Sequence, residues 1–413
     1  MISDVARGHV FITANSPGEI AGWVSPLVES LKKRDPSVMV SLVITPCQYA
    51  GGTEAEVAAE LSGVDRVVRI GRLTREIVFG GKGNRHLGEC SCVLFMGGDA
   101  LYAVLLSKLL KLPAFAYIGK PRWRKHFHKY MVTDANIRGR FLHAGVSPEK
   151  IAVVGHLSLD SARLTASRDE IMARLGLAGD SEVVTFLPGS RPFEIEFLIP
   201  FFAETAEIMH ERFPAIQLFF AISPFAKKEL IVKSAAQVNA RISSQGEMVT
   251  SGGCRIRLAL ERPHELMSVS RLIVTIPGTN NLQIAAMGVP MLIVTPLNKA
   301  EDIPMDGILG LLNPRIFPIG LLKRRLILSR TKHMKYVSLP NIIAGREIVP
   351  EMLDILEPRD VAERASSLLL NPGLCETISR DLREITRHRG AAERIASLVL
   401  GGRVRPAEEV RRL

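Results

Sequence analysis

Short apolar runs alternate along the chain with segments in which apolar residues recur every three or four positions. The runs predict β-strands, and the recurring pattern predicts amphipathic helices. Strands are expected near 9–13, 39–45, 92–96, 113–117, 151–154, 182–187, 216–222, 271–276 and 290–295. Helices are expected near 19–33, 54–62, 100–111, 194–211 and 279–287, and from Pro350 onward. Such alternation is typical of α/β folds with mostly parallel sheets.

The pattern breaks after Gly155-His156 and restarts at Ser167-Arg-Asp-Glu170, which fits a helix-capping box. At 413 residues the chain also exceeds what one hydrophobic core usually serves. We therefore expect two doubly wound, Rossmann-like lobes facing a cleft, over residues 1–160 and 161–350, with ligands at the carboxyl ends of the strands. Helices in 351–413 then either cross back to the first lobe or dock on a partner chain of a homodimer, and periodicity leaves both open.

The charge balance changes the picture of what the protein binds. Lysine and arginine number 53 against 42 acidic residues, a net charge of +11, which favours a nucleic acid, an anionic lipid or a phosphorylated substrate. The five cysteines are scattered, and Cys90-Ser-Cys92 has no second pair to complete a zinc site, so reduced thiols are expected. No signal-peptide pattern begins the sequence, and no apolar run reaches the roughly 18 residues that span a bilayer. We expect a cytoplasmic protein, soluble or peripheral at a membrane.

Two stretches of the second lobe pass from a strand through a glycine turn into a helix: Phe186–Glu194 and Thr275–Gln283. Free backbone N–H groups at such a turn, together with the helix dipole, favour a phosphate or pyrophosphate. A single Pro-Gly after a strand is often only a turn, but two in one lobe indicate an anion site. The candidate binding residues are Gly189, Ser190, Arg191, Gly278 and Thr279.

Other nucleotide-binding patterns are missing. No G-x-x-x-x-G-K-[ST] loop occurs, Gly81-Lys-Gly83 lacks the strand and third glycine of a dinucleotide fingerprint, and no Asp-x-Asp pair is present to hold a divalent ion. If the protein is a transferase that uses no metal, it would neutralise a leaving diphosphate with arginines and helix N-termini. We expect no metal and no bound cofactor.

In the first lobe, Val93–Met96 is followed by Gly97-Gly98-Asp99-Ala100. A carboxylate exposed at a strand end by two glycines can accept a proton from a sugar hydroxyl. The same residue can cap the following helix, as Asp does well, and the chemistry alone leaves both roles open. The loop Ser16–Gly22 after the first strand and His156 after the last one are candidate binding residues.

Two segments combine basic and apolar side chains, Lys120–Lys129 and Arg315–Lys335, and the second has seven Lys or Arg and no acid. Such segments indicate an interfacial, lipid-facing surface, which a Trp also suits. Nucleic-acid binding is a rival interpretation, although stacking aromatic residues are scarce in the second segment, and a solvated basic face is the plainest one. The candidate membrane-facing residues are Trp123, Arg124, Phe317, Lys323, Arg324 and Arg325.

The run Tyr336-Val-Ser-Leu-Pro-Asn-Ile-Ile-Ala-Gly-Arg-Glu-Ile-Val-Pro350 places an Asn, a Gly-Arg pair and an acid between apolar residues. Core packing alone does not require that combination. With the two glycine turns, the Gly97-x-Asp99-Ala100 turn and Gly155-His156, this run makes the chain resemble the lipid-A-disaccharide synthases, glycosyltransferases of the two-lobed GT-B fold. The resemblance spans roughly residues 9–400.

The resemblance implies an inverting transfer of 2,3-diacylglucosamine from UDP to the 6-hydroxyl of diacylglucosamine 1-phosphate, giving a β-1,6-linked disaccharide phosphate and UDP. Acylated sugars and the anionic inner face of the inner membrane are the implied partners, with no nucleic acid. The implied roles are Asp99 as the base; Arg191, Gly278, Thr279, Asn341 and Arg346 for the nucleotide and diphosphate; Gln283 for a ribose hydroxyl; and Ser16, Gly18, Glu19 and His156 for the sugars.

Three features depart from the family pattern. Gln283 stands where the family usually has Glu, Pro277-Gly-Thr279 replaces a Ser-Gly-Thr turn, and the Ser16–Gly22 loop has an inserted Pro and a Glu in place of Asp. Gln still forms hydrogen bonds, but it is a weaker acceptor than a carboxylate. The alternatives are another UDP-sugar enzyme of this fold, such as a different glycosyltransferase or an epimerase, and a non-catalytic lipid or nucleic-acid binder.

Overall fold

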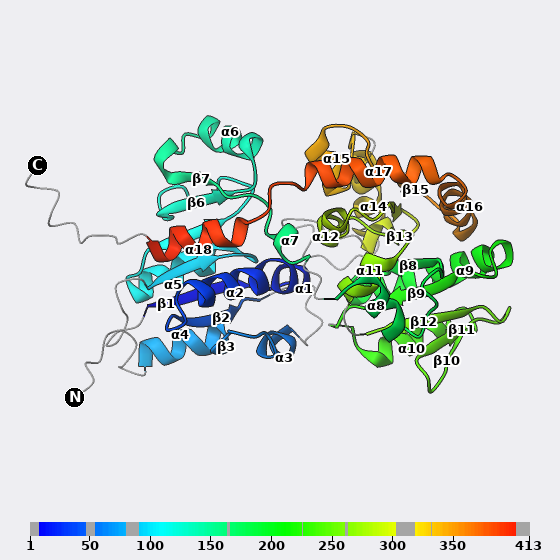
Figure 1. Cartoon of the computed structure of the whole chain (residues 1–413). Helices are drawn as coiled ribbons and strands as arrows, with labels where there is room; N and C mark the ends of the chain where they lie inside the picture. Colours follow the sequence, from blue (N-terminus) through cyan, green and yellow to red (C-terminus); the bar gives the residue numbers. More distant parts are fainter. Residues whose placement is uncertain are drawn as a thin grey trace, which may run out of the picture. The chain divides into compact units, whose positions relative to one another are not determined.

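The structure is a computed structural model of the chain. It describes residues 8–46, 54–79, 91–162, 166–224, 226–260, 263–302, 319–331 and 333–401. The chain divides into two compact units, which we call the first unit (Met1–Ser161 with His388–Leu413) and the second unit (Ala162–Arg387). Figure 1 shows both units, coloured by position in the sequence.

A seven-stranded parallel sheet forms the first unit, in the order β3-β2-β1-β4-β5-β6-β7. Most strand residues are buried on both faces, as expected for a parallel sheet covered by helices on both sides. The strands are β1 (His9–Ala14), β2 (Met39–Ile44), β3 (Arg66–Arg69), β4 (Cys92–Phe95), β5 (Ala114–Tyr117), β6 (Lys129–Val132) and β7 (Ile151–Val153).

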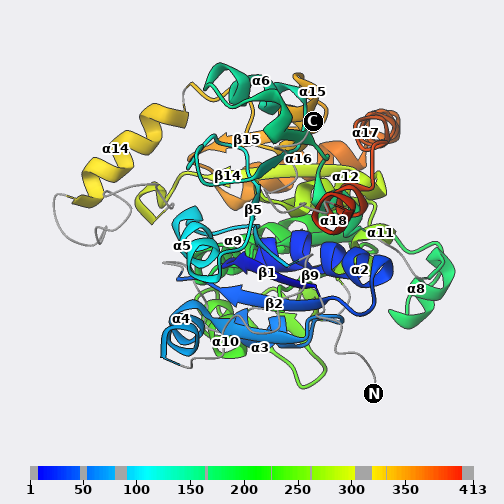
Figure 2. The ribbon, with the colours of Figure 1, turned by 90° about the vertical axis from the view of Figure 1, so that its left-hand side faces the viewer.

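Helices cover both faces of this sheet. Figure 2 shows α4 and α5 on one side and α2 and α18 on the other. On the α5 side, Ala103 and Val104 pack in one cluster with Phe95 and Tyr130. The helices are α1 (Pro17–Glu19), which continues through a π-helical turn (Ile20–Val24) into α2 (Ser25–Arg34), α3 (Glu54–Ala59), α4 (Ile70–Phe79), α5 (Ala100–Leu110), α6 (Ala135–His143), a 3₁₀ turn (Pro148–Lys150), α7 (Leu157–Asp160) and α18 (Ala391–Gly401).

The second unit has an eight-stranded sheet in the order β10-β11-β12-β9-β8-β13-β14-β15. Its strands pair in parallel except for β10 with β11 and β11 with β12. Phe186, Phe202 and Phe220 lie at its core, with ring centroids 5.5 and 5.7 Å from Phe186. The strands are β8 (Val183–Leu187), β9 (Gln217–Ala221), β10 (Arg241–Ile242), β11 (Glu247–Val249), β12 (Arg255–Ala259), β13 (Leu272–Thr275), β14 (Met291–Pro296) and β15 (Glu351–Asp354).

Helices of the second unit connect these strands and extend beyond them. They are α8 (Arg168–Arg174), α9 (Pro192–Arg212), α10 (Lys228–Ala236), α11 (Pro263–Val269), α12 (Asn280–Met287), a 3₁₀ turn (Ala300–Asp302), α14 (Ile319–Thr331), α15 (Leu339–Ala344), α16 (Pro358–Leu369) and α17 (Pro372–Ile385). Within the described ranges no helix is long and apolar enough to cross a membrane. Of the C-terminal helices, α16 and α17 belong to the second unit, whereas α18 packs beside α2 in the first.

The predicted fold class, an α/β protein with two doubly wound units, is confirmed. The prediction of a helix directly after Pro350 was wrong, because Glu351–Asp354 forms β15 and pairs in parallel with β14. Its side chains are only half-buried, so no apolar run marks it. Five other strands were not predicted, and each is short and begins with a charged residue: β3, β6, β10, β11 and β12.

Candidate functional site

Two polar turns of the first unit follow the carboxyl ends of parallel strands and therefore lie at the same end of the sheet. The Asn15–Glu19 turn follows β1, and Gly97-Gly98-Asp99 follows β4. β1 and β4 are neighbours, with Thr13 opposite Phe95, and the N–H of Gly97 donates to the Thr13 carbonyl at 3.1 Å. The two turns that the sequence singled out are therefore adjacent.

Asp99 lies exposed at the start of α5. Its carboxylate accepts a hydrogen bond from the Leu101 N–H at 2.9 Å, which is the geometry of a helix N-cap. The capping role is thus observed. A carboxylate that caps a helix at an exposed edge can still meet a ligand, so its role as a base stays a prediction.

Glu19 points into the first unit. Its Oε2 accepts from the N–H groups of Asn15 and Ser16 at 3.2 Å each, and its carboxylate lies where a β-carbon on Gly97 would be. Burial raises the pKa of the Glu19 carboxyl, against backbone N–H donors of Asn15, Ser16 and Gly98 that lower it. This placement corrects the expectation that Glu19 faces a sugar: the carboxylate holds the turn that carries Asp99. Ser16 and Gly18 lie half-buried beside it.

His156 follows β7 and occupies the N-cap position of α7 without capping it. Its Nε2 is buried and has no hydrogen-bond partner among the described residues. Burial lowers the pKa of His156, and the nearby Asp134 opposes that shift only in part, so the ring is neutral at pH 7. A neutral imidazole can accept or donate a hydrogen bond to a ligand hydroxyl.

The first glycine turn of the second unit is closed by its own helix. The Glu194 carboxylate accepts from the N–H groups of Ser190 and Arg191 at 2.8 and 3.0 Å, and the Arg191 guanidinium pairs with it at 3.0 Å. Gly189, at φ +90°, leaves no room for a β-carbon beside that carboxylate. The donors expected to face a phosphate at Gly189–Arg191 are therefore occupied by Glu194.

The second glycine turn is less occupied. The Gly278 N–H donates to Asn281 Oδ1 at 3.0 Å, but the N–H groups of Thr279 and Asn280 and the Thr279 hydroxyl make no hydrogen bond within the described residues. These groups lie at the N-terminus of α12, where an anion is favoured. Because β8 and β13 are parallel neighbours, both glycine turns lie at the carboxyl ends of adjacent strands.

Gln283, one turn into α12, is 7% exposed and hydrogen-bonded to His264. Burial lowers the pKa of His264, and this hydrogen bond opposes the shift. The sequence did not single out His264, because a single His before a helix gives no signal of its partner. The predicted contact of Gln283 with a ribose hydroxyl would thus use an amide that His264 already orients.

Asn341 lies at the centre of the Tyr336–Pro350 loop and is 0% exposed. Its Nδ2 donates to the Val349 carbonyl at 2.8 Å and to Glu351 Oε1 at 2.7 Å, and its Oδ1 accepts from the N–H groups of Ile348 and Val349 at 2.7 and 3.0 Å. All its hydrogen-bonding capacity is used within the protein, so Asn341 holds the loop rather than contacting a nucleotide. Arg346, at the exposed end of the loop, pairs with Asp381 of α17 at 2.8 Å.

Comparison with known proteins finds similarity to one family. Residues 147–303 match the family described as lipid-A-disaccharide synthetase. A lipid-A-disaccharide synthase of Salmonella paratyphi A is 25% identical over 91% of this chain and 92% of its own length. The Geobacter sulfurreducens synthase is 30% identical over 60% of this chain, and the match spans 56% of that protein, little more than half its length. The resemblance of the chain to the lipid-A-disaccharide synthases is confirmed.

Solved structures place the chain in the GT-B fold. The UDP-GlcNAc 2-epimerase of Neisseria meningitidis, solved bound to UDP-GlcNAc, superposes with a TM-score of 0.59 at 13% identity, covering 95% of this chain and all of that one. Acinetobacter baumannii MurG gives a TM-score of 0.51 at 13% identity, covering 95% and 99%. At such low identity these structures show a shared fold only.

The residues predicted to face a membrane lie in different settings in the structure. Trp123 and Arg124 are exposed in the first unit, and Arg325 is exposed on α14. Arg324 is half-buried with Glu301 at 4.0 Å. Lys323 is only 4% exposed, which corrects the expectation that it faces lipid, because α14 turns that side toward the protein. Phe317 lies outside the described residues.

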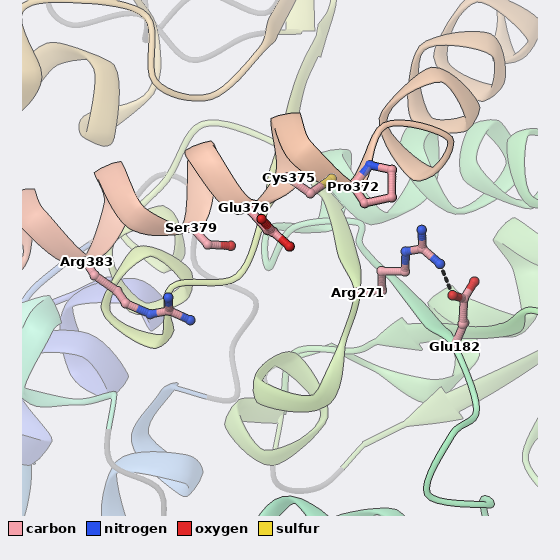
Figure 3. A pocket seen from close by; sticks show the side chains of 7 residues that line it. All are labelled: Glu182, Arg271, Pro372, Cys375, Glu376, Ser379 and Arg383. Atoms are coloured by element: carbon pink, nitrogen blue, oxygen red, sulfur yellow. Dashed lines mark ion pairs between the residues drawn. The ribbon is translucent and has the colours of Figure 1, made fainter.

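A hollow of about 390 Å³ opens elsewhere in the second unit (Figure 3). Glu182 and Arg271, which precede β8 and β13, place it at the amino ends of the strands, away from the glycine turns. Arg271 pairs with Glu182 and donates to the Leu369 carbonyl at 2.6 Å, so its guanidinium is committed to the protein. None of the predicted site residues lines it. The lining residues are Glu182, Arg271, Pro372, Cys375, Glu376, Ser379 and Arg383.

Proposed function

We propose that the protein transfers 2,3-diacylglucosamine from UDP to the 6-hydroxyl of diacylglucosamine 1-phosphate, with inversion at the anomeric carbon. The observation that carries the proposal is the exposed Asp99 carboxylate after the carboxyl end of β4, in a chain similar to lipid-A-disaccharide synthases. Asp99 would take the hydroxyl proton while the oxygen bonds to the anomeric carbon of the donor. The bond from that carbon to the diphosphate oxygen then breaks, and UDP leaves.

The second unit would bind the nucleotide. The unoccupied N–H groups of Thr279 and Asn280 suit the diphosphate, because their partial positive charges lie at the N-terminus of α12, where an anion is favoured. Glu194 would have to yield for Ser190 and Arg191 to contribute. In this proposal the leaving diphosphate is stabilised by N–H groups and Arg191, and neither a metal nor a cofactor takes part.

We further propose that the enzyme acts as a peripheral protein at the inner face of the inner membrane. Leu321 and Leu322 on α14 are 61% and 56% exposed, and Arg325 lies beside them in the sequence. Exposed apolar residues next to a cation suit an anionic lipid surface.

A second candidate is a different UDP-sugar enzyme of this fold. Gln283 favours it, since the amide stands where the family usually has Glu and is held by His264. This candidate predicts activity on water-soluble acceptors instead of acylated ones.

The experiment that tests the proposal measures UDP release from UDP-2,3-diacylglucosamine with and without diacylglucosamine 1-phosphate. Asp99→Asn is the informative variant, because Asn still caps α5 but cannot take a proton. We expect kcat to fall by about 10²–10⁴-fold with little change in stability. Asp99→Ala should lose the same activity and about 1 kcal/mol of stability as well.

Three outcomes would contradict the proposal in different ways. Release that needs neither acceptor nor Asp99 would discard the mechanism. Release with a water-soluble acceptor alone would favour the second candidate. Binding of UDP without any release would assign a different donor.

A further inference from the structure

The carboxyl ends of β1 and β4 form a switch point of the sheet in the first unit. The chain after β1 leads into α2 on one face of the sheet, and the chain after β4 leads into α5 on the other face (Figure 2). In open α/β sheets, ligands bind at such a point. Asp99 lies on the β4 side of it. On the β1 side lies Asn15, which has no role in the reaction proposed above.

Asn15 lies next to the turn that carries Asp99. A β-carbon on Gly98, which adopts φ +82°, would come within 2.9 Å of Asn15 Nδ2 and 3.1 Å of Asn15 Cγ. One Cα–Cβ bond and one Cα–Cα step further, the Cα of Asp99 is no more than about 8.5 Å from that Cγ. Gly98 and Asp99 are exposed and Asn15 is half-buried, so a single hexose can contact the side chains of both Asn15 and Asp99.

The side chain of Asn15 is held in place, yet one of its polar atoms is unused. Its Nδ2 donates to the carbonyl of Pro46, which follows β2, at 3.3 Å, and its backbone N–H donates to Glu19 Oε2 at 3.2 Å. Because only the amide nitrogen can donate to a carbonyl, the bond to Pro46 also identifies the oxygen of the carboxamide. This Oδ1 makes no hydrogen bond with any described residue. The protein therefore presents a fixed acceptor for a hydroxyl proton.

The surroundings of Asn15 are polar as well. Thr45 Oγ1, just after β2, would lie 2.5 Å from the same β-carbon on Gly98, and it is buried without a hydrogen-bond partner in the described part of the chain. Buried polar atoms without partners are few in folded proteins, and each calls for an explanation. This side of the switch point suits a sugar hydroxyl better than an acyl chain, because an acyl chain would leave these polar atoms unmatched.

We propose that Asn15 Oδ1 accepts a hydrogen bond from the 4-hydroxyl of the acceptor sugar and so helps to select that sugar. This inference rests on the proposed function, in which Asp99 takes the proton of the 6-hydroxyl. In a hexose the 4-hydroxyl stands on the ring carbon next to the one that carries C6, so the two hydroxyls are neighbours. Acyl groups on positions 2 and 3 leave the 4-hydroxyl proton available to Asn15.

The test combines a variant with a changed substrate. Wild type and Asn15→Ala are each assayed with diacylglucosamine 1-phosphate and with its 4-deoxy analogue, in neutral detergent micelles with the full-length protein. For wild type, the loss of the 4-hydroxyl should lower kcat/KM about 3–10-fold, as for one hydrogen bond between uncharged groups. Asn15→Ala should lower kcat/KM for the normal acceptor by a similar factor and leave the value for the 4-deoxy acceptor unchanged. Asn136→Ala, which removes an exposed carboxamide of α6 in the same unit, is the matched control and should change neither value.

An equal loss with both acceptors would show that Asn15 only supports the turn, and it would overturn the inference, as would no loss at all. A 4-deoxy donor forms the next arm: if Asn15→Ala has no effect with that donor, the residue binds the donor sugar instead. Should Asn15→Ala fail to fold, Asn15→Ser takes its place in the same comparison.

The inference can be decided even if the proposed function fails. If the wild type releases no UDP with either acceptor, calorimetric titration of both acceptors without donor replaces the kinetic assay. Tighter binding of the acceptor that has its 4-hydroxyl, lost in Asn15→Ala, would support the inference. Binding that is indifferent to the 4-hydroxyl, or no binding of either acceptor, would overturn it.

Discussion

At the scale of single residues, Gly97 and Glu19 compete for the same space. A β-carbon on Gly97 would collide with the Glu19 carboxylate, although the backbone of Gly97 is not left-handed. Glycine is required there by its neighbour and not by its own conformation. The absence of a side chain at position 97 is therefore part of how Glu19 reaches the turn before Asp99.

A double-mutant cycle in urea checks this pairing. Gly97→Ala alone should cost about 1–3 kcal/mol through overpacking. In the Glu19→Ala background the same change should cost at least about 1 kcal/mol less, because the obstructing carboxylate is gone. Gly71→Ala, with nothing within 4 Å of its added carbon, serves as the control and should be neutral or stabilising. Additive costs at positions 97 and 19 would show that the two do not meet.

Glu19 should also make folding stability depend on pH. Since burial raises its pKa in the folded state, the native protein binds the proton more tightly than the unfolded chain, and this stability is lost as the pH rises above the usual Glu range. Glu19→Gln, which imitates the protonated acid, should therefore gain stability over wild type at pH 8 compared with pH 4.5, as measured by urea unfolding.

Glu170 gives the opposite sign and is the control for that experiment. The Ser167 backbone N–H and hydroxyl lower the pKa of this exposed carboxyl, so its contribution is lost as the pH falls. The stability of Glu170→Gln relative to wild type should thus be higher at pH 4.5 than at pH 8. The same pH trend in both variants would refute the assignment of burial as the cause at Glu19.

The sequence identified these residues as candidates, but it did not show which way their side chains point. The exposed place of Asp99 was predicted because it depends on neighbours in sequence, a strand and two glycines, whereas its role as a base stays a prediction. Glu19 was expected to face a ligand because the residue that admits it inward, Gly97, lies 78 positions later, and no local pattern connects them. His264, the partner of Gln283, likewise precedes it without a local pattern that connects them. The partners of Asn341 are close in sequence, 7 to 10 positions later, but no periodicity identifies them as acceptors and donors of a buried amide.

At the scale of an element, the Tyr336–Pro350 loop is organised around one side chain. Asn341, at the centre of the loop, is bonded to its end at Ile348 and Val349. Glu351 of β15 holds the start of the loop, because it accepts from the N–H groups of Val337 and Ser338 at 2.8 and 2.9 Å. The most specific motif of the sequence therefore stabilises the fold of the segment that leads into β15.

Asn341→Ala should destabilise the second unit by about 2–4 kcal/mol, since it leaves several buried polar groups without partners. Thermal or urea unfolding measures it. Ile342→Ala, an adjacent and 51% exposed position, is the control and should cost well under half as much. If Asn341→Ala kept full stability but lost UDP binding, the residue would be a ligand contact after all.

The N-terminus of helix α9 has a partner that the sequence analysis did not consider. A capping box is usually announced by Ser or Thr three residues before Glu, and here Arg191 takes that position before Glu194. The sequence analysis treated the N–H groups of Ser190 and Arg191 as free for a phosphate, whereas the Glu194 carboxylate accepts from both in the structure. The signal that remained in the sequence was the spacing to Glu194 itself.

At the scale of the whole molecule, the chain leaves the first unit after Ser161 and returns to it at His388. Asp160, 6% exposed, fixes the return: its two carboxylate oxygens accept from the N–H groups of Gly390 and Ala392 at 2.7 Å each. The Arg394 Nε donates to the Val154 carbonyl at 2.8 Å. A single acid thus anchors α18 to a segment 230 residues earlier.

Asp160→Ala should cost the first unit about 2–4 kcal/mol, because two buried N–H groups lose a charged acceptor. Amide hydrogen exchange should rise most in α18. Glu393→Gln, which alters an exposed carboxylate at the start of the same helix, should leave exchange there nearly unchanged. Protection of α18 that survives Asp160→Ala would mean that packing on α2, not the carboxylate, retains it.

The alternation of strands and helices was enough to predict two α/β units, since both halves repeat the same local pattern. It was not enough to place the tail, because the apolar face of a helix such as α18 indicates that it must be covered but not by which partner. Ile395 and Val399 supply that face, and α2 meets it.

The return of α18 has a consequence for how the protein is made. A ribosome that has finished residue 161 must still synthesise the entire second unit before the helix that covers α2 emerges, a delay of some tens of seconds at roughly 5–20 residues per second. Over that interval the nascent first unit presents an uncovered apolar surface, the kind that chaperones recognise. The unit begun first is thus completed last.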